Sequence, residues 1–419
     1  MNQYDAIIVG ARCGGAPLAM LLARAGHKVL LVDRMAIGSD MMSTHYVKRT
    51  GAALLDKWGL LDAITRIGTP KILTQSFNID GITLNGSAPP CGNVGFDVTP
   101  RRVYLDRILV EAAAEAGAEV RDRFIVKELL FDAGKVCGIR GSSGGNDVKE
   151  YARIVIGADG ANSIVANQVK AEKYVEAGTH TCGHYAYYSG VRTSNDHADL
   201  HILSDERRFY ITFPTSDDLD MVFLFWPNEM AEEVRSDVHA AFDKSLQLVP
   251  ELEARVNGAT RETRITGTHL LPNFFRRAHG EGWALVGDAA LHRDPITAQG
   301  ITNAFTHADI LAEELCRAFQ GEQSVSDAAK RYDDRQFTLL KPMFDYTVHL
   351  AMLQPLAPEV KAILPAVVND PLATSAFIGA FLGSVPLDQV FPPALTQRFA
   401  SDVAKQQTRN HKEGERHVA

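Results

Sequence analysis

The first third of the chain carries short apolar runs without alternation, separated by a stretch with helical spacing. Residues 6–9 (AIIV) and 29–32 (VLLV) are such runs, which are typical of parallel strands covered on both faces. Residues 17–25 repeat apolar positions at helical intervals, and Gly26 marks the end of that predicted helix. The N-terminal residues therefore predict a β-α-β unit.

The same pattern of short apolar runs and helical spacing recurs further along the chain. Residues 104–116 predict a helix, and residues 119–122 and 153–156 predict strands. The run at residues 284–286 (ALV) is again typical of a buried strand, which indicates that the chain re-enters the first sheet. Further helices are predicted near residues 300–319, 324–350 and 371–382.

A different pattern occupies residues 179–226. Aromatic and β-branched residues dominate there, broken by polar turns such as residues 215–220. This pattern predicts an antiparallel sheet.

These patterns place the chain in the α/β class, with a Rossmann-like domain interleaved with an antiparallel β-sheet domain and followed by C-terminal helices. The predicted boundaries are 1–70, 101–178 and 280–320 for the Rossmann-like domain, 71–100 and 179–279 for the second domain, 321–404 for the C-terminal helical region, and 405–419 for a disordered tail.

Composition and charge narrow the function classes. The 419 residues are 46% hydrophobic and 22% charged, and the net charge of −8 gives no reason to expect nucleic acid or an anionic membrane surface as a partner. No apolar stretch approaches the roughly 20 residues that span a bilayer, and the N-terminus lacks signal-peptide features. The five cysteines show no paired spacing, so they predict reduced thiols in a cytoplasmic protein, with no metal site.

A glycine-rich turn follows the first predicted strand directly. Gly10, Gly14 and Gly15 let backbone N–H groups approach a pyrophosphate at the positive end of the following helix. Asp33 ends the next strand, 23 residues after Gly10, where its carboxylate can accept both hydroxyls of a ribose. Arg12 stands where the G-x-G-x-x-G pattern has its middle glycine. The flanking strand, helix and acid favour dinucleotide binding over a plain structural turn.

Two further motifs follow predicted strands. GADGANS at residues 157–163 contains an Asp-Gly turn, which by itself carries little information. GDAA at residues 287–290 precedes Pro295 and a helix that opens near Gly300. Asp288 can hold a ribityl hydroxyl, and the helix N-terminus supplies unpaired N–H groups and a partial positive charge. The negative charge of a reduced flavin at N1 and the C2 carbonyl suits such a helix end.

Taken together and in this order, the three motifs resemble those of the FAD-dependent group A monooxygenases, which have the fold of para-hydroxybenzoate hydroxylase. Flavin-dependent halogenases and geranylgeranyl reductases share that fold. The resemblance covers about residues 4–320. It implies FAD as the cofactor and NAD(P)H as the electron donor, used directly or through a separate flavin reductase.

The resemblance also implies which residues contact the cofactor. The glycine-rich turn and the acid are similar to those that hold the ADP half of FAD, the Asp-Gly motif to a segment that contacts FAD and NAD(P)H, and the Gly-Asp motif to the segment that binds the riboflavin half. Arg102 is similar to a family arginine near the cofactor, and its neighbour Arg101 fits that signal equally well. The implied cofactor-binding residues are Gly10, Arg12, Gly14, Gly15, Asp33, Arg34, Arg102, Asp159, Gly160, Asp288, Pro295, Ala298, Gln299, Gly300 and Ile301.

The chain departs from the family pattern at three positions. Leu291 stands where the family has histidine, Ala298 where it often has glycine, and Ala166 where it has arginine. These differences concern NAD(P)H contact more than FAD binding. The Trp-x-Trp-x-Ile-Pro motif of halogenases is absent, which counts against halogenation.

Two histidines are candidates for catalysis. His45 belongs to a polar loop that in the family approaches the flavin ring. It is interpreted either as a residue that, with Ser43, faces the isoalloxazine or the substrate, or as a solvated loop residue. His292 is interpreted either as lining the flavin face or as capping a strand end.

The resemblance implies an FAD-dependent monooxygenase, a hydroxylase that inserts one oxygen atom from O2 into a small aromatic or apolar substrate through a C4a-peroxyflavin. The chain is expected to act as a monomer or homodimer. One alternative is an FAD-dependent reductase or dehydrogenase of the geranylgeranyl-reductase type. The other is a flavin carrier without catalysis.

Overall fold

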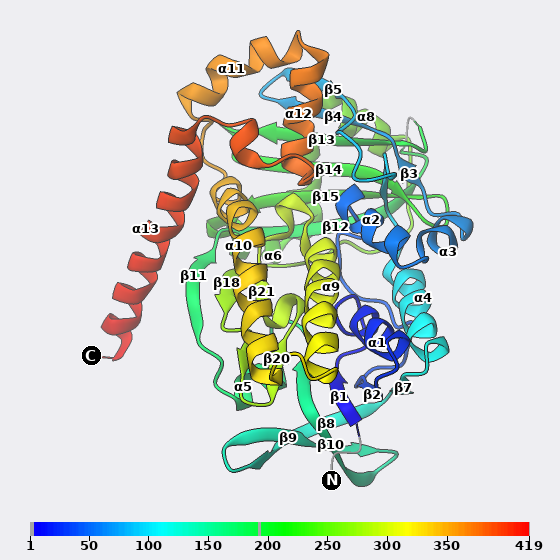
Figure 1. The fold of residues 1–419 in the computed structure, drawn as a ribbon. Coiled ribbons are helices and arrows are strands. Elements are labelled where there is room, and N and C mark those ends of the chain that lie inside the picture. Colours follow the sequence, from blue (N-terminus) through cyan, green and yellow to red (C-terminus); the bar gives the residue numbers. More distant parts are fainter. Residues whose placement is uncertain (1–3, 192–193, 419) are drawn as a thin grey trace.

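Five parallel strands form the centre of the first sheet in the computed structural model, which describes residues 4–191 and 194–418 (Figure 1). Their order is β20-β10-β1-β2-β7. An antiparallel strand, β19, extends one edge, and the hairpin β8–β9 pairs with the first half of β10. The bounds are β1 (Tyr4–Val9), β2 (Val29–Val32), β7 (Glu119–Arg121), β8 (Phe124–Asp132), β9 (Lys135–Ser143), β10 (Asn146–Gly157), β19 (His279–Gly280) and β20 (Trp283–Leu285).

The central strands are apolar because helices cover them. Ile7, Ile8, Leu30 and Leu31 have no exposed surface, and burial of each such side chain contributes about 1.5–3 kcal/mol. Figure 1 shows α1, α4 and α9 grouped around this sheet, with α10 beside α9. The helices of this part are α1 (Gly15–Arg24), α2 (Arg49–Lys57), α3 (Leu61–Arg66), α4 (Arg102–Glu115), α5 (Ile164–Gln168) and α9 (Gly300–Phe319).

The second sheet is built from two separate parts of the chain, in the order β16-β12-β15-β14-β13-β4-β5, with β17 paired to β12. It is antiparallel as predicted, except that β4 and β13 run parallel. The difference arises because β4 enters from a distant part of the chain and no hairpin fixes its direction. The bounds are β4 (Thr74–Ile79), β5 (Ile82–Gly86), β12 (Thr181–Ser189), β13 (His197–Leu203), β14 (Arg208–Thr215), β15 (Leu219–Pro227), β16 (Thr260–Arg261) and β17 (Thr266–Thr268).

The two faces of this sheet pack against different partners because successive side chains point to opposite sides. Tyr185 and Tyr187 face a core that includes Ile296, from the loop before α9. Ala186 and Tyr188 face a second core, together with three short helices. These helices are α6 (Ala231–Ser236), α7 (Val238–Leu246) and α8 (Pro250–Asn257).

A third, small sheet joins the two domains. It contains β11 (Lys173–Thr179), β18 (Pro272–Arg276) and β21 (Leu291–His292). The predicted boundaries at residues 178/179 and 279/280 fall at the end of β11 and inside β19. A two-stranded ladder of β3 (Lys71–Ile72) and β6 (Asp97–Val98) forms a further connection.

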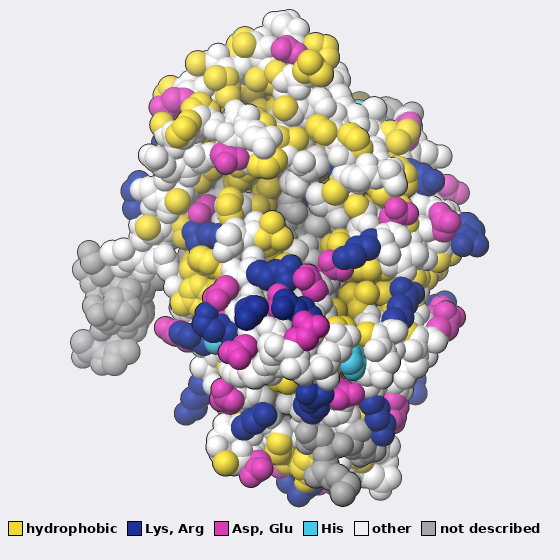
Figure 2. Space-filling model, in the orientation of Figure 1, with side chains coloured by type: hydrophobic (Ala, Val, Ile, Leu, Met, Phe, Trp, Pro, Cys, Tyr) yellow, Lys and Arg dark blue, Asp and Glu magenta, His cyan; other side chains and the backbone are white. Residues whose placement is uncertain are grey.

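The C-terminal helices extend the core of both domains. They are α10 (Val325–Ala351), α11 (Pro358–Val368), α12 (Pro371–Leu382) and α13 (Pro393–Val418). The predicted disordered tail from residue 405 instead falls within α13 as far as Val418. This helix is one-sided: Leu395, Phe399 and Val403 are buried at four-residue intervals, so a largely polar sequence still docks. Figure 2 shows apolar side chains gathered on the upper surface, where Figure 1 places α11 and α12.

The α/β class and the combination of a Rossmann-like sheet with an antiparallel domain and C-terminal helices are confirmed. Within residues 4–191 and 194–418, no helix has the length and apolar character needed to cross a membrane.

Candidate active site

The glycine-rich turn allows an unusually close approach of backbone segments. A side chain on Gly15 would begin 1.9 Å from the carbonyl oxygen of Gly10. Gly10 has a φ of +107°, and a side chain there would begin 2.4 Å from the carbonyl oxygen of Ala158. Both positions therefore require glycine, and the N-terminus of α1 is held directly behind the ends of β1 and β10.

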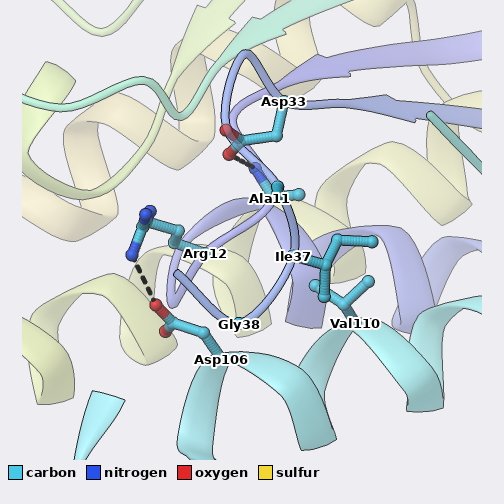
Figure 3. Close-up of a pocket in the computed structure, with 8 residues that line it drawn as sticks. Ala11, Arg12, Asp33, Ile37, Gly38, Asp106 and Val110 are labelled. Carbon is cyan, nitrogen blue, oxygen red and sulfur yellow. Dashed lines mark hydrogen bonds and ion pairs between the residues drawn. The ribbon is translucent and has the colours of Figure 1, made fainter. Parts of the chain in front are cut away.

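Asp33 closes one side of a small pocket beside this turn (Figure 3). Its Oδ2 accepts a hydrogen bond from the backbone N–H of Ala11 at 2.8 Å, and its Oδ1 accepts one from Met35 at 2.8 Å. The pocket is completed by the loop after β2 and by α4. A carboxylate fixed by two backbone donors at the mouth of a pocket is suited to accept ribose hydroxyls.

Two arginines next to the pocket share one carboxylate. Arg12 donates to Asp106 at 2.9 Å and to the hydroxyl of Ser39 at 2.9 Å. Arg102 is buried and makes two bonds of 3.0 Å to the same Asp106. Arg12 lines the pocket, where its guanidinium group suits charge-assisted hydrogen bonds to a pyrophosphate. Arg34 lies exposed on the loop after β2.

The second motif lies against the first. Asp159 accepts a hydrogen bond from the backbone N–H of Ile164 at 2.7 Å, while its buried Oδ1 has no partner. Burial raises the pKa of this carboxyl group. Gly160 follows with a φ of +83°, which favours glycine. In the structure this motif holds the start of α5 beside the glycine-rich turn.

The third motif, GDAA at residues 287–290, carries an exposed carboxylate and precedes the N-terminus of α9. Asp288 is exposed, whereas Gly287 and Ala289 on either side are buried. Ala298 has a φ of +48° in the tight turn before α9, a conformation that explains the glycine often found there in the family. Gly300 opens α9 into free space, and the side-chain nitrogen of the buried Gln299 has no partner.

These features fit an FAD molecule stretched between the two helix ends. The glycine turn, Arg12 and Asp33 would hold the ADP half, and Asp288 would hold the ribityl chain. The first N–H groups of α9, with Gln299, would face the pyrimidine end of the flavin. Pro295 and Ile301 flank that helix end, half-buried and buried respectively.

His45 lies at the junction of the two domains and has no exposed surface. It adopts a φ of +55° after the exposed loop, and its Nε2 is hydrogen-bonded to the hydroxyl of Tyr187. Its Nδ1 is buried without a partner. Burial lowers the pKa of His45 to about 3, and the charges of Arg102 and Arg101 add to that effect. The solvated interpretation is therefore wrong: His45 is a buried, neutral imidazole.

Two tyrosines of β12 and an arginine at the start of α4 surround His45. Tyr187 stacks on the imidazole with ring centres 5.7 Å apart, and Tyr185 meets it edge-on at 6.4 Å. Arg101 lies over the Tyr187 ring, 5.2 Å from its centre, and pairs with Asp217 at 2.7 Å. Arg101 thus ties the start of α4 to the β14–β15 turn, while Arg102 pairs with Asp106. The two arginines have separate roles.

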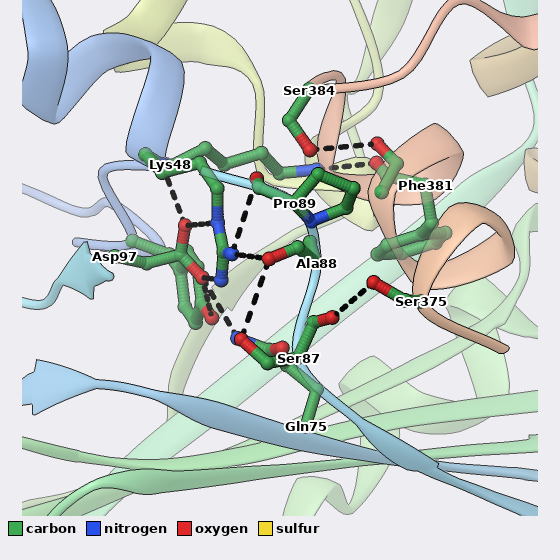
Figure 4. Close-up of polar contacts among 12 residues, drawn as sticks. Lys48, Gln75, Ser87, Ala88, Pro89, Asp97, Ser375, Phe381 and Ser384 are labelled. Carbon is green, nitrogen blue, oxygen red and sulfur yellow. Dashed lines mark hydrogen bonds and ion pairs between the residues drawn. The ribbon is translucent and has the colours of Figure 1, made fainter. Parts of the chain in front are cut away.

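A buried polar network fixes the segment that carries His45 (Figure 4). Asp97 has no exposed surface and accepts hydrogen bonds from Tyr46 at 2.9 Å and from the backbone N–H of Arg49 at 2.6 Å. Gln75 on β4 donates to the same carboxylate at 2.9 Å. Lys48 reaches across to the carbonyl oxygen of Phe381 at the end of α12, at 2.7 Å. The network joins both domains to α12.

His292 is not part of this cluster. Its ring stacks on Phe274 with centres 5.7 Å apart, and its Nδ1 is hydrogen-bonded to the carbonyl oxygen of Pro272. These contacts hold β21 against β18, in keeping with the interpretation of a strand-end residue.

From the sequence, Tyr185 and Tyr187 are interpreted either as pocket-wall residues or as packing residues, and Arg293 was missed. Tyr185 and Tyr187 alternate along a strand as any packed pair would, so nothing local separates them from core residues. Arg293 is buried in the loop after β21 and donates to Asn303 on α9 at 2.6 Å. The sequence feature that could have indicated Arg293 is its position: a charged residue between the GDAA motif and Pro295, two segments assigned to the flavin site.

The fold and this site define an FAD-dependent oxidoreductase. The chain belongs to the FAD binding domain family, whose model matches residues 3–338. The resemblance inferred from the three motifs is thereby confirmed.

Individual relatives cover most of the chain. It is 28% identical over 348 residues to a digeranylgeranylglycerophospholipid reductase of Methanocella arvoryzae, covering 79% of this chain and 82% of the relative. A flavin-dependent brominase has a TM-score of 0.78 at 17% identity, covering 96% of this chain and 100% of that chain. PqsL, a probable FAD-dependent monooxygenase from Pseudomonas aeruginosa, has a TM-score of 0.73 at 23% identity, covering 83% and 95%. At these identities the two structures show the fold alone.

Replacement of Gly15 tests the cofactor cradle. Gly15→Ala places a methyl group within 1.9 Å of the Gly10 carbonyl oxygen, so we expect FAD affinity to fall at least about 100-fold, because the turn must move away from the pyrophosphate. Gly26→Ala is the matched control: it meets no atom within 4 Å and should cost only about 1 kcal/mol of stability at its φ of +85°. Fluorescence titration of apoprotein with FAD measures both. Equal affinity in the two variants would contradict the assignment.

The buried histidines predict a pH dependence of stability. Burial lowers the pKa of both His45 and His307 to about 3, so the unfolded chain binds protons below pH 6.5 that the folded chain cannot bind. Stability is therefore full above pH 6.5 and lost as pH falls toward 3, by up to about 1.4 kcal/mol per pH unit for each histidine. Urea unfolding measured between pH 7 and 5 should show that the free energy of unfolding falls less steeply with decreasing pH in His307→Asn than in the wild type. His239 is exposed, so His239→Asn should keep the wild-type dependence of the unfolding free energy on pH. An unchanged pH dependence in His307→Asn would be inconsistent with this account.

Proposed function

We propose that this protein is an FAD-dependent monooxygenase that hydroxylates a small aromatic or apolar substrate. The observation that supports this most is His45, a neutral imidazole buried where the two domains meet. One of its nitrogens is hydrogen-bonded to Tyr187, and the other has no protein partner. A buried nitrogen without a partner is costly unless a ligand completes it, so Nδ1 is available to a substrate hydroxyl.

The side chains around His45 exclude water. Tyr185 is 6% exposed, and Phe223 and Phe225 stack at 4.2 Å on the same face of the second sheet. Ile296 and Ala298 belong to the same core, so this aromatic face lies over the loop that leads into α9. An apolar enclosure of this kind protects reactive oxygen chemistry from water. Its side chains pack on one another, which favours a small substrate over a long chain.

Bound FAD would supply the redox chemistry, taking electrons from NAD(P)H and activating O2. The protein's contribution is binding and proton transfer. In the tautomer with hydrogen on Nε2, His45 accepts a proton from the substrate at Nδ1 while Nε2–H donates to the Tyr187 oxygen. Arg101 packs on the ring of Tyr187 and helps to fix its position. Because burial lowers the pKa of His45 to about 3, Nδ1 is unprotonated at neutral pH and can accept a hydrogen bond from the substrate hydroxyl.

A second candidate is reduction of a carbon–carbon double bond. It is favoured by the curated relative from Methanocella arvoryzae, a digeranylgeranylglycerophospholipid reductase. The same His45–Tyr187 pair would then deliver a proton to carbon. The close packing of the aromatic face argues against a polyprenyl substrate, because a chain of that length needs an open channel.

Oxygen dependence separates the two reactions. With NAD(P)H or a flavin reductase as donor, we expect turnover of small phenols and related aromatic compounds to require O2. Under 18O2, mass spectrometry should find one labelled oxygen atom in each product molecule. Turnover that continues without O2 and adds hydrogen to an alkene would instead establish the reductase.

Tyr187→Phe tests the proton path. Loss of the hydroxyl leaves His45 without its Nε2 partner, and general acid–base contributions predict a decrease in kcat of about 100-fold or more, with FAD affinity unchanged. Tyr210→Phe is the matched control, since Tyr210 is also buried in the same sheet, on strand β14, but points to the opposite face and donates to the carbonyl oxygen of Ser245. Stopped-flow measurement of product formation gives the comparison. Equal rates in both variants would rule out the path.

A further inference from the structure

Arg293 carries a buried positive charge that has no ion pair among the residues described. Its side chain is 7% exposed, and only one bond from it is satisfied, from Nη2 to the Oδ1 of Asn303 at 2.6 Å. Its Nε and Nη1 are buried without a partner. Among the residues described, no carboxylate lies within 4.0 Å of the guanidinium, so Arg293 has no ion pair there.

The charge persists at neutral pH. Burial lowers the pKa of Arg293 to about 9, with Asp288 opposing the effect, so the group remains protonated near pH 7. Its neighbour Lys48 differs, because burial lowers the pKa of that amine well below its usual value and its Nζ donates to Phe381. A buried guanidinium with unsatisfied N–H groups costs several kcal/mol, which suggests a function for it.

The position of Arg293 indicates that function. Asn303, its partner, lies in the first turn of α9, where its backbone N–H bonds to the carbonyl oxygen of Gln299. The guanidinium therefore lies beside the helix end whose N–H groups already carry a partial positive charge. Gln299 adds an unpartnered, buried side-chain N–H at the same place. The charge of Arg293, the N-terminus of α9 and the side-chain amide of Gln299 therefore lie together at the start of this helix.

We propose that Arg293, acting through the first turn of α9, raises the reduction potential of the bound FAD. Two-electron reduction, FAD + 2e⁻ + H⁺ → FADH⁻, adds a negative charge to the flavin that a positive charge beside it stabilises. The role holds for either reaction under the proposed function and rests only on FAD binding at the site described above. It does not require Arg293 to touch the substrate.

Asn303→Asp is the sharpest test because the change is isosteric. The new carboxylate pairs with Arg293 at the existing 2.6 Å contact and cancels its charge, so the fold should be as stable as before or more stable. We expect reduced FAD to lose about tenfold in affinity relative to oxidised FAD, which lowers the midpoint potential by about 30 mV for a two-electron couple. Stepwise reduction with dithionite against a reference dye measures the potential. Asn78→Asp on the distant β4 is the matched control and should keep the wild-type value.

Two further variants test the charge itself. Arg293→Met should lower the potential as Asn303→Asp does, and Arg293→Lys should stay closer to the wild type. If Arg293→Met does not yield a folded flavoprotein, Asn303→Asp decides the question alone. A wild-type potential in Asn303→Asp with FAD fully bound would overturn the proposal and leave Arg293 a structural residue. Failure of the monooxygenase assay would leave this result unaffected, because the potential is measured without substrate.

Discussion

One buried carboxylate, Asp97, holds the two domains in the arrangement on which the site depends. It accepts hydrogen bonds from the first residue of α2, from Tyr46 and from Gln75 on β4, all without exposure to water. Removal of one partner of such a buried pair costs about 3–5 kcal/mol. The segment that it fixes also carries His45, and a bond from Lys48 extends the connection to α12. The junction is therefore set by polar contacts as well as by apolar packing.

This constraint explains how two unlike regions meet at the candidate site. On the Rossmann-like side are charges and helix ends: Arg102, Arg293, Asp288 and the N-terminus of α9. On the other side is an aromatic sheet face with few polar atoms. A flavin is both a charged and a flat aromatic molecule, so such a boundary suits it. His45, neutral because it is buried, lies between the two regions.

The sequence predicted what is encoded locally. Helices near residues 300–319 and 371–382 match α9 and α12, because glycine and proline mark their ends. The glycine-rich turn is a steric requirement at Gly10 and Gly15, visible in one short motif. The contact between His45 and Tyr187 joins residues 142 positions apart, and no periodicity encodes it. The parallel pairing of β4 with β13 depends in the same way on long-range packing.

Arg293 and α13 show two further limits of sequence reasoning. A buried arginine without an ion pair contradicts the usual preference of charged residues for the surface, so its burial could be seen only in three dimensions. α13 has a polar composition, and only its spacing of Leu395, Phe399 and Val403 shows that it docks. Both cases depend on which neighbours the fold supplies.

The central claim is that one FAD lies between the glycine turn at Gly10 and the N-terminus of α9. The most direct test is the flavin content of the purified protein, from its visible absorption spectrum and from FAD released on denaturation. The account predicts one FAD per chain, either as purified or after addition of FAD to the apoprotein. A folded protein that stays colourless and takes up no added FAD would contradict it.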